Sequence, residues 1–532
     1  MASLSTFRPS YIARLDLMKE IAVHEAATAL HDEAGRTSTL LAGVGLILLV
    51  ALPALFLNLG APAIQLWDEA RPALHALEMA YPVAGHEAAE RWLVPHYRGE
   101  PESWHLKPPL MTWLSAVSMR ALGPSEFALR LPSASAALAT ALLLLLFCFY
   151  RLQSPLAGIA AGIALLTTTG YVAEHVARTA DYDALLTLWT TAFGLAAFAA
   201  IEGEGRQRAL WVLGAWLSLV AATLTKSIAG LMLVPVVFLY AGTRGQLRLM
   251  LRAPMFWAGL VVWVIVVVSY YGIRENLQPG YLAAVLNHEI LGRYGEGIDG
   301  LGRSAFYYMQ QLVAWQGHPW LAFVPAAALA AVSSSGQTQK RAGWFALAVA
   351  TSYVLIISFS ATKHPWYLAP AFPWIAFLFG MGLEAVAKRL SLPRILIGAS
   401  VLLLPCYVAL GDAISHPSRA VAPWLESSEH EYAEAEYLRH ILRRTPPLRH
   451  GDRLVFVSDG YNGALEFYAA LAARSGVQVE IREQAPTEGV PVASCSVNLV
   501  HTDSGSRPEI SHQRVTPSGE AFCFMVLPRP TP

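Results

Sequence analysis

Charge is scarce in this sequence. Only 14% of its 532 residues are Asp, Glu, Lys or Arg, whereas 55% are hydrophobic and the mean hydropathy is positive. This composition excludes an ordinary soluble globule. The 38 basic and 38 acidic side chains cancel. No excess of positive charge is left to favour nucleic acid as a partner.

The N-terminus lacks the pattern of a cleavable signal peptide. Residues 1–37 are polar and mixed in charge, which is the wrong order for such a signal. We expect the first apolar run to be retained and residues 1–37 to form a cytoplasmic segment. The stretch from Tyr11 to Ala34 fits an amphipathic helix on the membrane surface and a solvated tail equally well.

Long apolar runs recur from Leu40 to Leu410. Runs of about 16 to 25 residues can cross about 30 Å of hydrocarbon as helices. The predicted spans lie near residues 38–58, 127–149, 156–173, 184–201, 209–225, 228–243, 255–272, 312–332, 343–360, 366–386 and 394–411. Met111 to Leu122 is too short to span and reads as re-entrant or interfacial. Counting short runs differently gives about 11–13 helices, so the sequence predicts an α-helical polytopic membrane protein.

Basic residues predict the orientation of these spans. The alternate connections carry Lys or Arg, namely Arg151, Arg206 and Arg208, Arg244-Arg248-Arg252, Lys340-Arg341, and Lys388-Arg389-Arg394. The positive-inside rule assigns that side to the cytoplasm. The N-terminus shares it, and the chain beyond Asp412 then lies outside.

From about Ala413 the composition and hydrophobic pattern of the chain are those of a soluble domain. Arg453 to Ser458 reads as a buried strand, Gly463 to Arg474 as an amphipathic helix and Val477 to Arg482 as a second strand. This β-α-β pattern predicts a small extracytoplasmic α/β domain. The predicted parts are a cytoplasmic segment, a membrane domain and the outer domain, over residues 1–37, 38–412 and 413–532.

Cysteine is also sparse, with four residues in the chain. Cys148 and Cys406 lie in predicted spans, where packing explains them. Cys495 and Cys523 lie in strand-like segments of the outer domain. An outer compartment permits a disulfide between them, and the pattern fits two buried thiols as well.

The ionisable residues outside the spans collect on the outer face. The first outer loop, about residues 60–110, opens with Asp68-Glu69 and closes with HLKPPL from His105. Three further outer segments carry charged and aromatic side chains: Glu174 to Asp183, Arg274 to Tyr308 and Thr362 to Tyr367. The cytoplasmic loops, in contrast, are short and basic. Ionisable groups at a membrane boundary are either solvated or take part in chemistry.

Such a surface suits group transfer next to a bilayer. A carboxylate can act as general base toward an acceptor hydroxyl or phosphate, while Lys or Arg holds a phosphate leaving group. Aromatic rings can stack on a sugar. The plainer explanation, a solvated loop charge or an interfacial anchor, covers most of the first loop's His and Glu residues. Asp68 and Lys107 fit both explanations.

The motifs in their order resemble those of the GT-C glycosyltransferases. Trp67-Asp68-Glu69-Ala70-Arg71 is similar to the acidic first-loop motif, and HLKPPLMTWL from His105 to the segment that follows it. Further matches are Ala177-Arg178-Thr179-Ala180-Asp181, Thr225-Lys226-Ser227, Glu289 to Tyr294, and KHPWYLAP from Lys363. The resemblance covers roughly residues 40 to 412. It is closest to the bacterial branch with lipid A aminoarabinose transferases and related polyprenyl-phosphate-sugar transferases.

The resemblance implies an inverting transferase with the GT-C fold. It implies an undecaprenyl-phosphate-linked sugar as donor, and a lipid such as lipid A or another envelope glycan as acceptor. The enzyme would lie in the bacterial inner membrane, among membrane lipids, with its site facing the periplasm. No nucleic acid partner is implied.

The matched positions also imply roles for individual residues. Asp68 is the catalytic carboxylate, with Glu69 and Arg71 beside it. Lys107 and Arg293 hold the donor phosphate. Asp181 is the second-loop acid, and Asp183 competes with it for that role. The other implied substrate-binding residues are Glu289, Lys363 and Tyr367.

Two departures from the family pattern bear on a cofactor. Aminoarabinose transferases carry a glutamate before the motif's lysine, where this chain has Leu106, and a histidine after the third-loop glutamate, where it has Ile290. Both positions are associated with a metal ion. His105 and His288 could substitute only if the backbone shifts. We therefore expect no required metal and a sugar other than aminoarabinose.

Three alternatives remain. A protein O-mannosyltransferase shares the acidic first loop, but KPPL and KHPWYLAP favour the lipid-modifying branch. A transporter or flippase of polyprenyl-linked substrates predicts charges inside the spans, lining a path. Here the charges gather at one face. A receptor or scaffold that uses only the outer domain would leave the ordered polar loops unexplained.

Overall fold

The computed structural model describes residues 35–65, 68–82, 88–102, 106–172, 175–296 and 303–390, and shorter stretches of the outer part. These stretches are 435, 438–439, 442–443, 453–457, 462–482, 497–502, 509–515 and 521–528. The predicted helix from Tyr11 to Ala34, the span at 394–411, and Cys406 and Cys495 lie outside the described residues. The side chain of Cys523 does so too.

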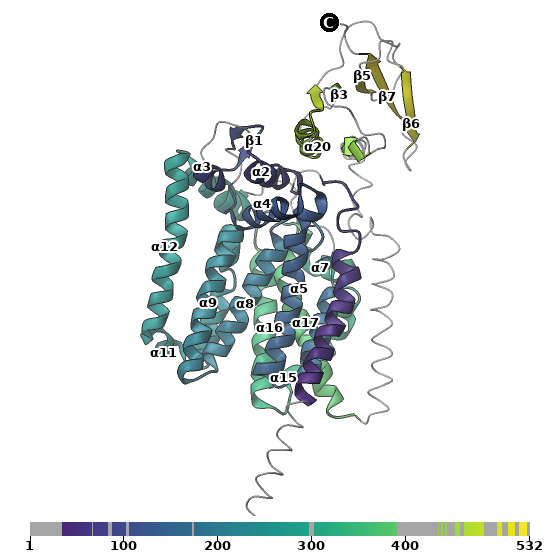
Figure 1. Cartoon of the computed structure of the whole chain (residues 1–532). Helices are drawn as coiled ribbons and strands as arrows, with labels where there is room; N and C mark the ends of the chain where they lie inside the picture. The colour runs from purple at the N-terminus through teal and green to yellow at the C-terminus, as the bar shows by residue number, and fades with distance from the viewer. Residues whose placement is uncertain are drawn as a thin grey trace, which may run out of the picture.

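A bundle of long apolar helices forms the body of the protein (Figure 1). Seven described helices are long and apolar enough to cross a membrane: Gly35–Phe56, α5 (Glu126–Arg151), α8 (Asp183–Ile201), Gly205–Leu231 (α9, Gly205–Lys226, continued by η2, Ser227–Leu231), α12 (Pro254–Leu277), α16 (Gln337–Ser358) and Pro365–Ala387. The last combines η6 (Pro365–Ala371) and α17 (Phe372–Ala387). The predicted polytopic helical fold is confirmed.

Shorter apolar helices account for the other predicted spans between residues 38 and 386. They are α6 (Pro155–Leu166), α10 (Val234–Thr243) and Trp320–Val332, which joins η5 (Trp320–Phe323) to α15 (Val324–Val332). The remaining described helical turns are α7 (Thr169–Val172), α13 (Tyr281–Ala284), η3 (Val285–Glu296), α14 (Tyr307–Gln311) and η4 (Leu312–Gln316).

Proline marks where many of these helices begin. α6, α10, α12, α15 and α17 each carry a proline at their first or second position. The backbone N–H groups in the first turn of a helix have no partner within the helix, so proline, which lacks this group, loses no hydrogen bond there. Its fixed φ also suits a helix start. α5 begins differently, because the Ser125 side chain accepts a hydrogen bond from the Ala128 backbone N at 3.2 Å.

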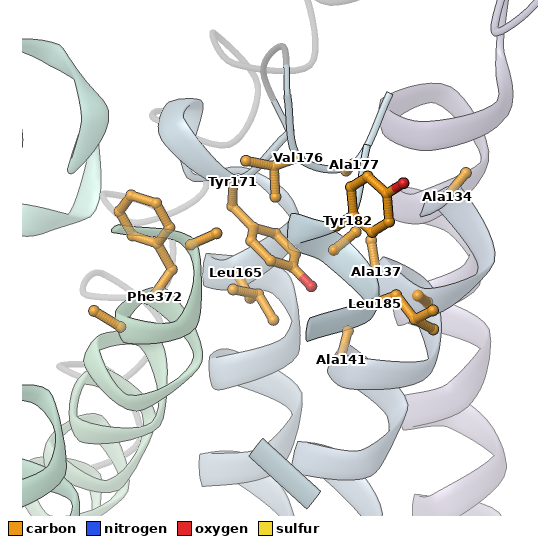
Figure 2. Packing of buried hydrophobic residues seen from close by; sticks show 14 of the residues in the cluster. Ala134, Ala137, Ala141, Leu165, Tyr171, Val176, Ala177, Tyr182, Leu185 and Phe372 are labelled. Atoms are coloured by element: carbon orange, nitrogen blue, oxygen red, sulfur yellow. The ribbon is translucent and has the colours of Figure 1, made fainter. Parts of the chain in front are cut away.

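Small residues let the helices approach closely. A Cβ placed on Gly158 of α6 would lie 2.8 Å from the Cα of Leu145 in α5, so no larger residue fits there. Figure 2 shows the same principle nearer the outer end, where Ala137 and Ala141 lie beside the bulkier Tyr182 and Leu185. Close backbone approach is the usual route to helix association in lipid.

The first outer loop folds into a cover over one end of the bundle. It forms α2 (Ala70–Ala80), α3 (Ala88–Leu93), a short hairpin of β1 (His96–Tyr97) and β2 (Glu100–Pro101), and α4 (Leu110–Leu122). Figure 1 shows α2 and α4 lying across the end of the bundle. α4 covers the Met111 to Leu122 run and is not among the described helices long enough to cross a membrane, so its re-entrant or interfacial position stays a prediction.

At the opposite end of the bundle, one carboxylate links several of the connections between helices. Glu202 accepts hydrogen bonds from Arg244 Nε and Arg341 Nη1, each at 2.7 Å, and from the Tyr240 hydroxyl at 2.9 Å. Three connections with basic residues are thereby tied together, and α11 (Leu247–Arg252) follows in the same region.

The outer domain contains the predicted strand–helix–strand unit. β3 (Arg453–Val457) pairs in parallel with β4 (Gln478–Arg482), and α20 (Gly463–Arg474) connects them. That prediction is confirmed. A further sheet has the order β5-β7-β6, formed by Val497–Thr502, Ala521–Pro528 and Glu509–Val515.

One hydrogen-bonded cluster joins this domain to the bundle. Glu126, at the start of α5, accepts from Arg439 Nε at 2.6 Å, Arg443 Nη2 at 2.5 Å and the Tyr468 hydroxyl at 2.9 Å. The Tyr468 oxygen also accepts from the Ile64 backbone N at 2.9 Å. The outer domain therefore forms a hydrogen bond to the loop that leads to Asp68.

Candidate functional site

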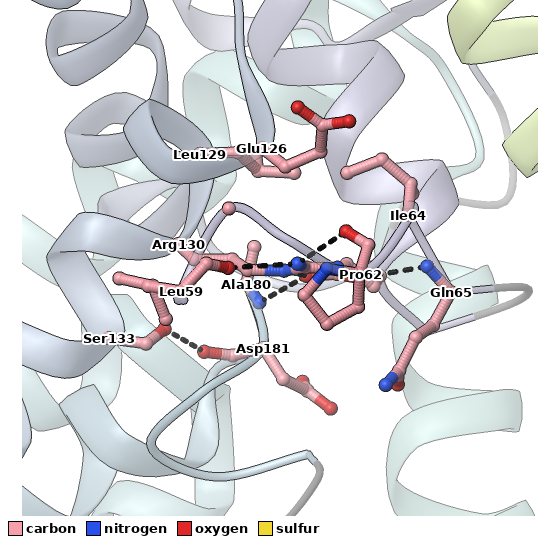
Figure 3. Close-up of polar contacts among 12 residues, drawn as sticks. Leu59, Pro62, Ile64, Gln65, Glu126, Leu129, Arg130, Ser133, Ala180 and Asp181 are labelled. Carbon is pink, nitrogen blue, oxygen red and sulfur yellow. Dashed lines mark hydrogen bonds and ion pairs between the residues drawn. The ribbon is translucent and has the colours of Figure 1, made fainter. Parts of the chain in front are cut away.

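A buried ion pair underlies the first outer loop. Arg130 of α5 binds Glu69 through two bonds, Nε to Oε1 at 2.6 Å and Nη2 to Oε2 at 2.7 Å, and each side chain is 1% exposed. The guanidinium also donates to the carbonyls of Leu59, Pro62 and Ala63 (Figure 3). A buried charge that is paired and fully hydrogen-bonded offsets much of its desolvation cost.

Glu69 also connects the first loop to the second. Its carboxylate accepts from the backbone N of Gln65 and of Ala180, both at 2.9 Å. Asp68 precedes Glu69 in the chain and Asp181 follows Ala180. The ion pair therefore fixes both neighbouring acids relative to α5.

Asp68, His175 and Asp181 meet as a result. His175 Nδ1 lies 3.0 Å from Asp181 Oδ2 and 3.8 Å from Asp68 Oδ2. The Asp68 side chain is 43% exposed, whereas those of His175 and Asp181 are buried. Asp68 is thus the member of the cluster that a substrate can reach.

The His175 ring is held in place by stacking. It lies against Trp366 with centroids 3.9 Å apart and planes 29° apart, and Trp366 stacks in turn on His364 at 4.6 Å. His175 has a positive φ of 59°. A non-glycine residue in this conformation is uncommon, and such backbone strain clusters at functional sites.

Asp181 is a strongly stabilised carboxylate. Burial works to raise its pKa, but the hydrogen bond and charge of His175 outweigh burial. Lys226 and Lys107 add to this effect, and together they lower the pKa of Asp181 to about 2. Asp181 therefore stays ionised at neutral pH and is a weak base there.

A small cavity lined by both apolar and charged side chains lies next to this cluster. Its volume is ≈ 50 Å³, and its lining includes Asp183, Lys226, Glu289 and Tyr367. Lys226 Nζ contacts Asp183 Oδ2 at 2.5 Å and lies 5.1 Å from the centre of the Tyr367 ring. The structure thus brings three of the predicted substrate-binding residues together around Lys226.

Lys107 lies beside Tyr182 in the second-loop turn. Its Nζ is 4.8 Å from the centre of the Tyr182 ring, a cation–π contact. Its positive charge acts on Asp181 and on Asp183. A phosphate near Asp68 would therefore meet positive charge from Lys107.

Three predicted residues are placed differently. Arg71 pairs with Glu102 at 3.0 Å, so its charge is used within the first loop. The buried Lys363 donates from Nζ to the Ser360 carbonyl at 2.5 Å, which holds the loop before η6. The backbone of Arg293 lies in η3, and its side chain lies outside the described residues.

Sequence reasoning gave no role to three residues that organise the site, namely Arg130, His175 and Lys226. A charge at the end of an apolar run was the available signal for Arg130 and Lys226. His175 stands in a polar loop among other polar residues, so no spacing distinguished it.

The cluster also has the composition of a metal site. One ligand atom each from Asp68, His175 and Asp181 lie within 4.8 Å of one another. Two carboxylates and an imidazole are suitable ligands for a divalent transition metal. The expectation that no metal is required rested on Leu106, which is buried with its carbonyl accepting from the Tyr281 hydroxyl, and on Ile290. The Asp68–His175–Asp181 set uses neither position.

Comparison with known proteins gives consistent findings. The family model "Dolichyl-phosphate-mannose-protein mannosyltransferase" matches residues 106–271. The chain is 26% identical over 344 residues to an undecaprenyl phosphate-alpha-4-amino-4-deoxy-L-arabinose arabinosyl transferase 2 of Sodalis glossinidius, covering 63% of this chain and 58% of that protein. A similar transferase of Edwardsiella ictaluri is 25% identical over 342 residues, again covering 63% and 58%. The chain thus spans 58% of the length of these curated relatives.

The fold also has a solved counterpart. The crystal structure of ArnT from Cupriavidus metallidurans bound to undecaprenyl phosphate matches with a TM-score of 0.62 at 19% identity. The match covers 82% of this chain and 85% of that one. The two proteins therefore share their fold.

Two neighbouring acids should respond differently to neutralisation. Glu69→Gln leaves the Arg130 charge buried without its partner, so we expect a loss of about 3–5 kcal/mol of stability. Asp68→Asn changes a half-exposed side chain and should change stability by less than about 0.5 kcal/mol. Thermal unfolding of both variants in the same detergent measures the difference. Equal destabilisation would show that Glu69 is not the structural member of the pair.

Proposed function

We propose that this chain is a membrane glycosyltransferase of the GT-C superfamily and that it moves a sugar from a polyprenyl-phosphate donor to an envelope acceptor. The donor would be an undecaprenyl-phosphate-linked sugar, and the acceptor a lipid of the lipid A type or another envelope glycan. The relatives named above act with undecaprenyl phosphate-linked aminoarabinose, and the ArnT structure holds undecaprenyl phosphate. These names support the donor class.

One observation carries this proposal. Asp68 is a half-exposed carboxylate beside the buried pair of His175 and Asp181, and the charges of Lys107 and Lys226 act on Asp181 and on the nearby Asp183. An accessible base next to positive charge is what the transfer of a sugar from a phosphate requires.

The chemistry follows from this arrangement. An acceptor oxygen attacks the anomeric carbon from the side opposite the phosphate. The new carbon–oxygen bond forms as the bond to the phosphate oxygen breaks, and Asp68 takes the acceptor's proton. The bonding electrons leave with the polyprenyl phosphate, whose charge Lys107 balances. A single displacement inverts the anomeric configuration.

The other residues hold the reacting groups. The ionised Asp181 fixes His175, and the His175–Trp366 stack fixes the wall beside Asp68. Asp183, Glu289 and Tyr367 line the neighbouring cavity and supply carboxylate and aromatic groups for sugar hydroxyls. Arg293 stays a prediction as a second phosphate ligand.

The membrane location of the site is also part of the proposal. The chain is a multi-pass membrane protein, and α2, which begins just after Asp68 and Glu69, lies at one end of the bundle (Figure 1). The distribution of Lys and Arg supports a position of that end outside the cytoplasm. We propose the bacterial inner membrane with the site facing the periplasm, where the lipid tail of the donor can stay in the bilayer.

A divalent cation fits the cluster as a cofactor. Asp68, His175 and Asp181 would hold it, and when bound it would supply positive charge for the departing phosphate. This contrasts with the expectation drawn from Leu106 and Ile290 that no metal is required.

A protein O-mannosyltransferase activity is the second candidate, because the matching family model at residues 106–271 bears that description. Mass spectrometry of lipid A and envelope glycans, from cells with and without the gene, separates the two. A mass difference in these lipids or glycans supports the proposal. An unchanged lipid fraction together with lost protein glycosylation would favour the second candidate.

Asp68→Asn removes the base and keeps the size of the side chain. General-base catalysis typically contributes about 10²–10⁴-fold to a rate, so we expect transfer to fall by about that factor. The measurement is the mass-shifted envelope product in a deletion strain that expresses the variant at wild-type level. Glu100→Gln, an exposed change in β2, is the matched control. Near-normal product from Asp68→Asn would remove Asp68 from the catalytic role.

Lys107→Met tests the phosphate site. A hydrogen bond to a charged group contributes about 1.5–3 kcal/mol, so undecaprenyl phosphate should bind roughly 10- to 100-fold more weakly. Binding to purified protein can be followed by native mass spectrometry, with Lys340→Met at the other end of the bundle as control. Unchanged affinity for undecaprenyl phosphate would instead move Lys107 to the acceptor side.

Metal removal distinguishes the two expectations about a cofactor. If the cluster holds a metal, elemental analysis of the purified protein should find about one divalent ion per chain, and His175→Ala should lose it. Dialysis against EDTA should then lower transfer, and added Zn²⁺ or Mn²⁺ should restore it. Full transfer after complete chelation would support the sequence-based expectation that no metal is required.

A further inference from the structure

A second and larger cavity lies at the end of the bundle opposite Asp68. Its volume is ≈ 310 Å³, and residues of α8, α9, α10, α11 and α12 line it. Nearly all of the lining is apolar, and its longest polar side chains are Arg208, Gln246 and Arg252. Figure 1 shows α11 and the adjoining ends of α9 and α12 at the far end from α2 and α4.

The cavity is deep enough to span one lipid leaflet. On α9 the lining runs from Gly205 to Leu219, which is a rise of about 21 Å along a helix. Half of a bilayer is about 15 Å of hydrocarbon, or about 20–22 Å with its headgroup region. Aromatic rings form part of the lining, where Phe256 contacts Trp216 and Phe238 with centroids 5.4 and 6.2 Å apart.

One wall of the cavity faces the bilayer. α12 is the least buried of the seven candidate spans, with 11% of its apolar window inside the protein. Val261, Ile265 and Val268 on this helix are all more than half exposed. A chain from the surrounding lipid can therefore enter beside α12 without unfolding the bundle.

Positive charge gathers at the shallow end. The Arg208 guanidinium is held by the carbonyls of Ala200 and Gly203 at 3.1 and 2.8 Å and by Gln246 Oε1 at 3.2 Å. Arg252 ends α11 and is exposed.

The surrounding charges leave this positive charge in excess. Exposed Arg206 and Arg248 stand near the cavity, with exposed Glu204 on the same side. Glu202 is already neutralised by Arg244 and Arg341. An apolar pocket with a basic rim matches a lipid with an anionic headgroup.

We propose that this cavity binds an anionic phospholipid of the cytoplasmic leaflet. One acyl chain fills the space between α9, α10 and α12, and the phosphate lies against Arg252 and Arg208. The donor lipid is a poorer occupant, because its phosphate must reach Asp68 at the other end. This proposal is independent of the transferase activity.

The test is lipid binding by the purified full chain in mixed micelles, followed by native mass spectrometry. Phosphatidylglycerol and phosphatidylcholine with identical acyl chains are the probes. We expect one tightly held phosphatidylglycerol per wild-type chain and clearly weaker phosphatidylcholine binding. Arg252→Gln should weaken phosphatidylglycerol about fivefold and leave phosphatidylcholine unchanged, as expected for one basic residue at a membrane surface. Lys340→Gln, an exposed change on α16 away from the cavity lining, is its control.

The cavity itself is tested by filling it. Val212→Trp points a large ring into the lining and should lower phosphatidylglycerol occupancy at least about tenfold, because the chain and the ring cannot share the space. Leu213→Trp, at the next and exposed position of α9, should retain the lipid. Ala209→Leu is a milder filling variant should Val212→Trp fail to fold.

Three results would overturn the proposal. The first is equal binding of the two phospholipids to the wild type. The second is retained phosphatidylglycerol in the folded cavity-filling variants. The third is displacement of the bound phosphatidylglycerol by equimolar undecaprenyl phosphate, which would make the donor lipid the occupant.

Discussion

The Glu69–Arg130 ion pair is the interaction on which the candidate site depends. An arginine this deeply buried would be costly alone, yet its two bonds to Glu69 and its bonds to three carbonyls satisfy it. The same Glu69 carboxylate holds the backbone at Ala180. Two loops far apart in the sequence are therefore fixed to one helix, and the carboxylates of Asp68 and Asp181 meet around His175.

The outer domain secures the same loop from the other side. The Tyr468 hydroxyl donates to Glu126 and accepts from the Ile64 backbone, only four residues before Asp68. Glu126 and Arg130 lie one helical turn apart on α5. A single turn of this helix thus anchors the bundle, the first loop and the outer domain. The outer domain in this arrangement supports the site as well as covering it.

Much of this fold could be predicted from composition and periodicity, because bilayer thickness restricts what an apolar run can become. The strand–helix–strand unit near Arg453 and the short helix near Met111 followed from periodicity and run length. The arrangement of the residues within the site could not be predicted in this way. Composition and periodicity do not separate Asp68 from Glu69, which only the family resemblance distinguished, since their difference in burial arises from Arg130, 61 positions after Glu69. His175 became visible only when the second loop was folded, because its contacts to Trp366 and Asp68 are all between distant segments.

The adjacency of Asp68 and Glu69 now has a physical reason. A reactive carboxylate at a membrane boundary must be accessible, and an accessible loop residue has little to hold it in place. Here the next residue supplies the missing rigidity, because Glu69 is locked by a bidentate arginine and two backbone N–H groups. Asp68 can stay half exposed without being free to move away from His175. Glu69 therefore fixes the position of the loop, and Asp68 is the carboxylate that can react.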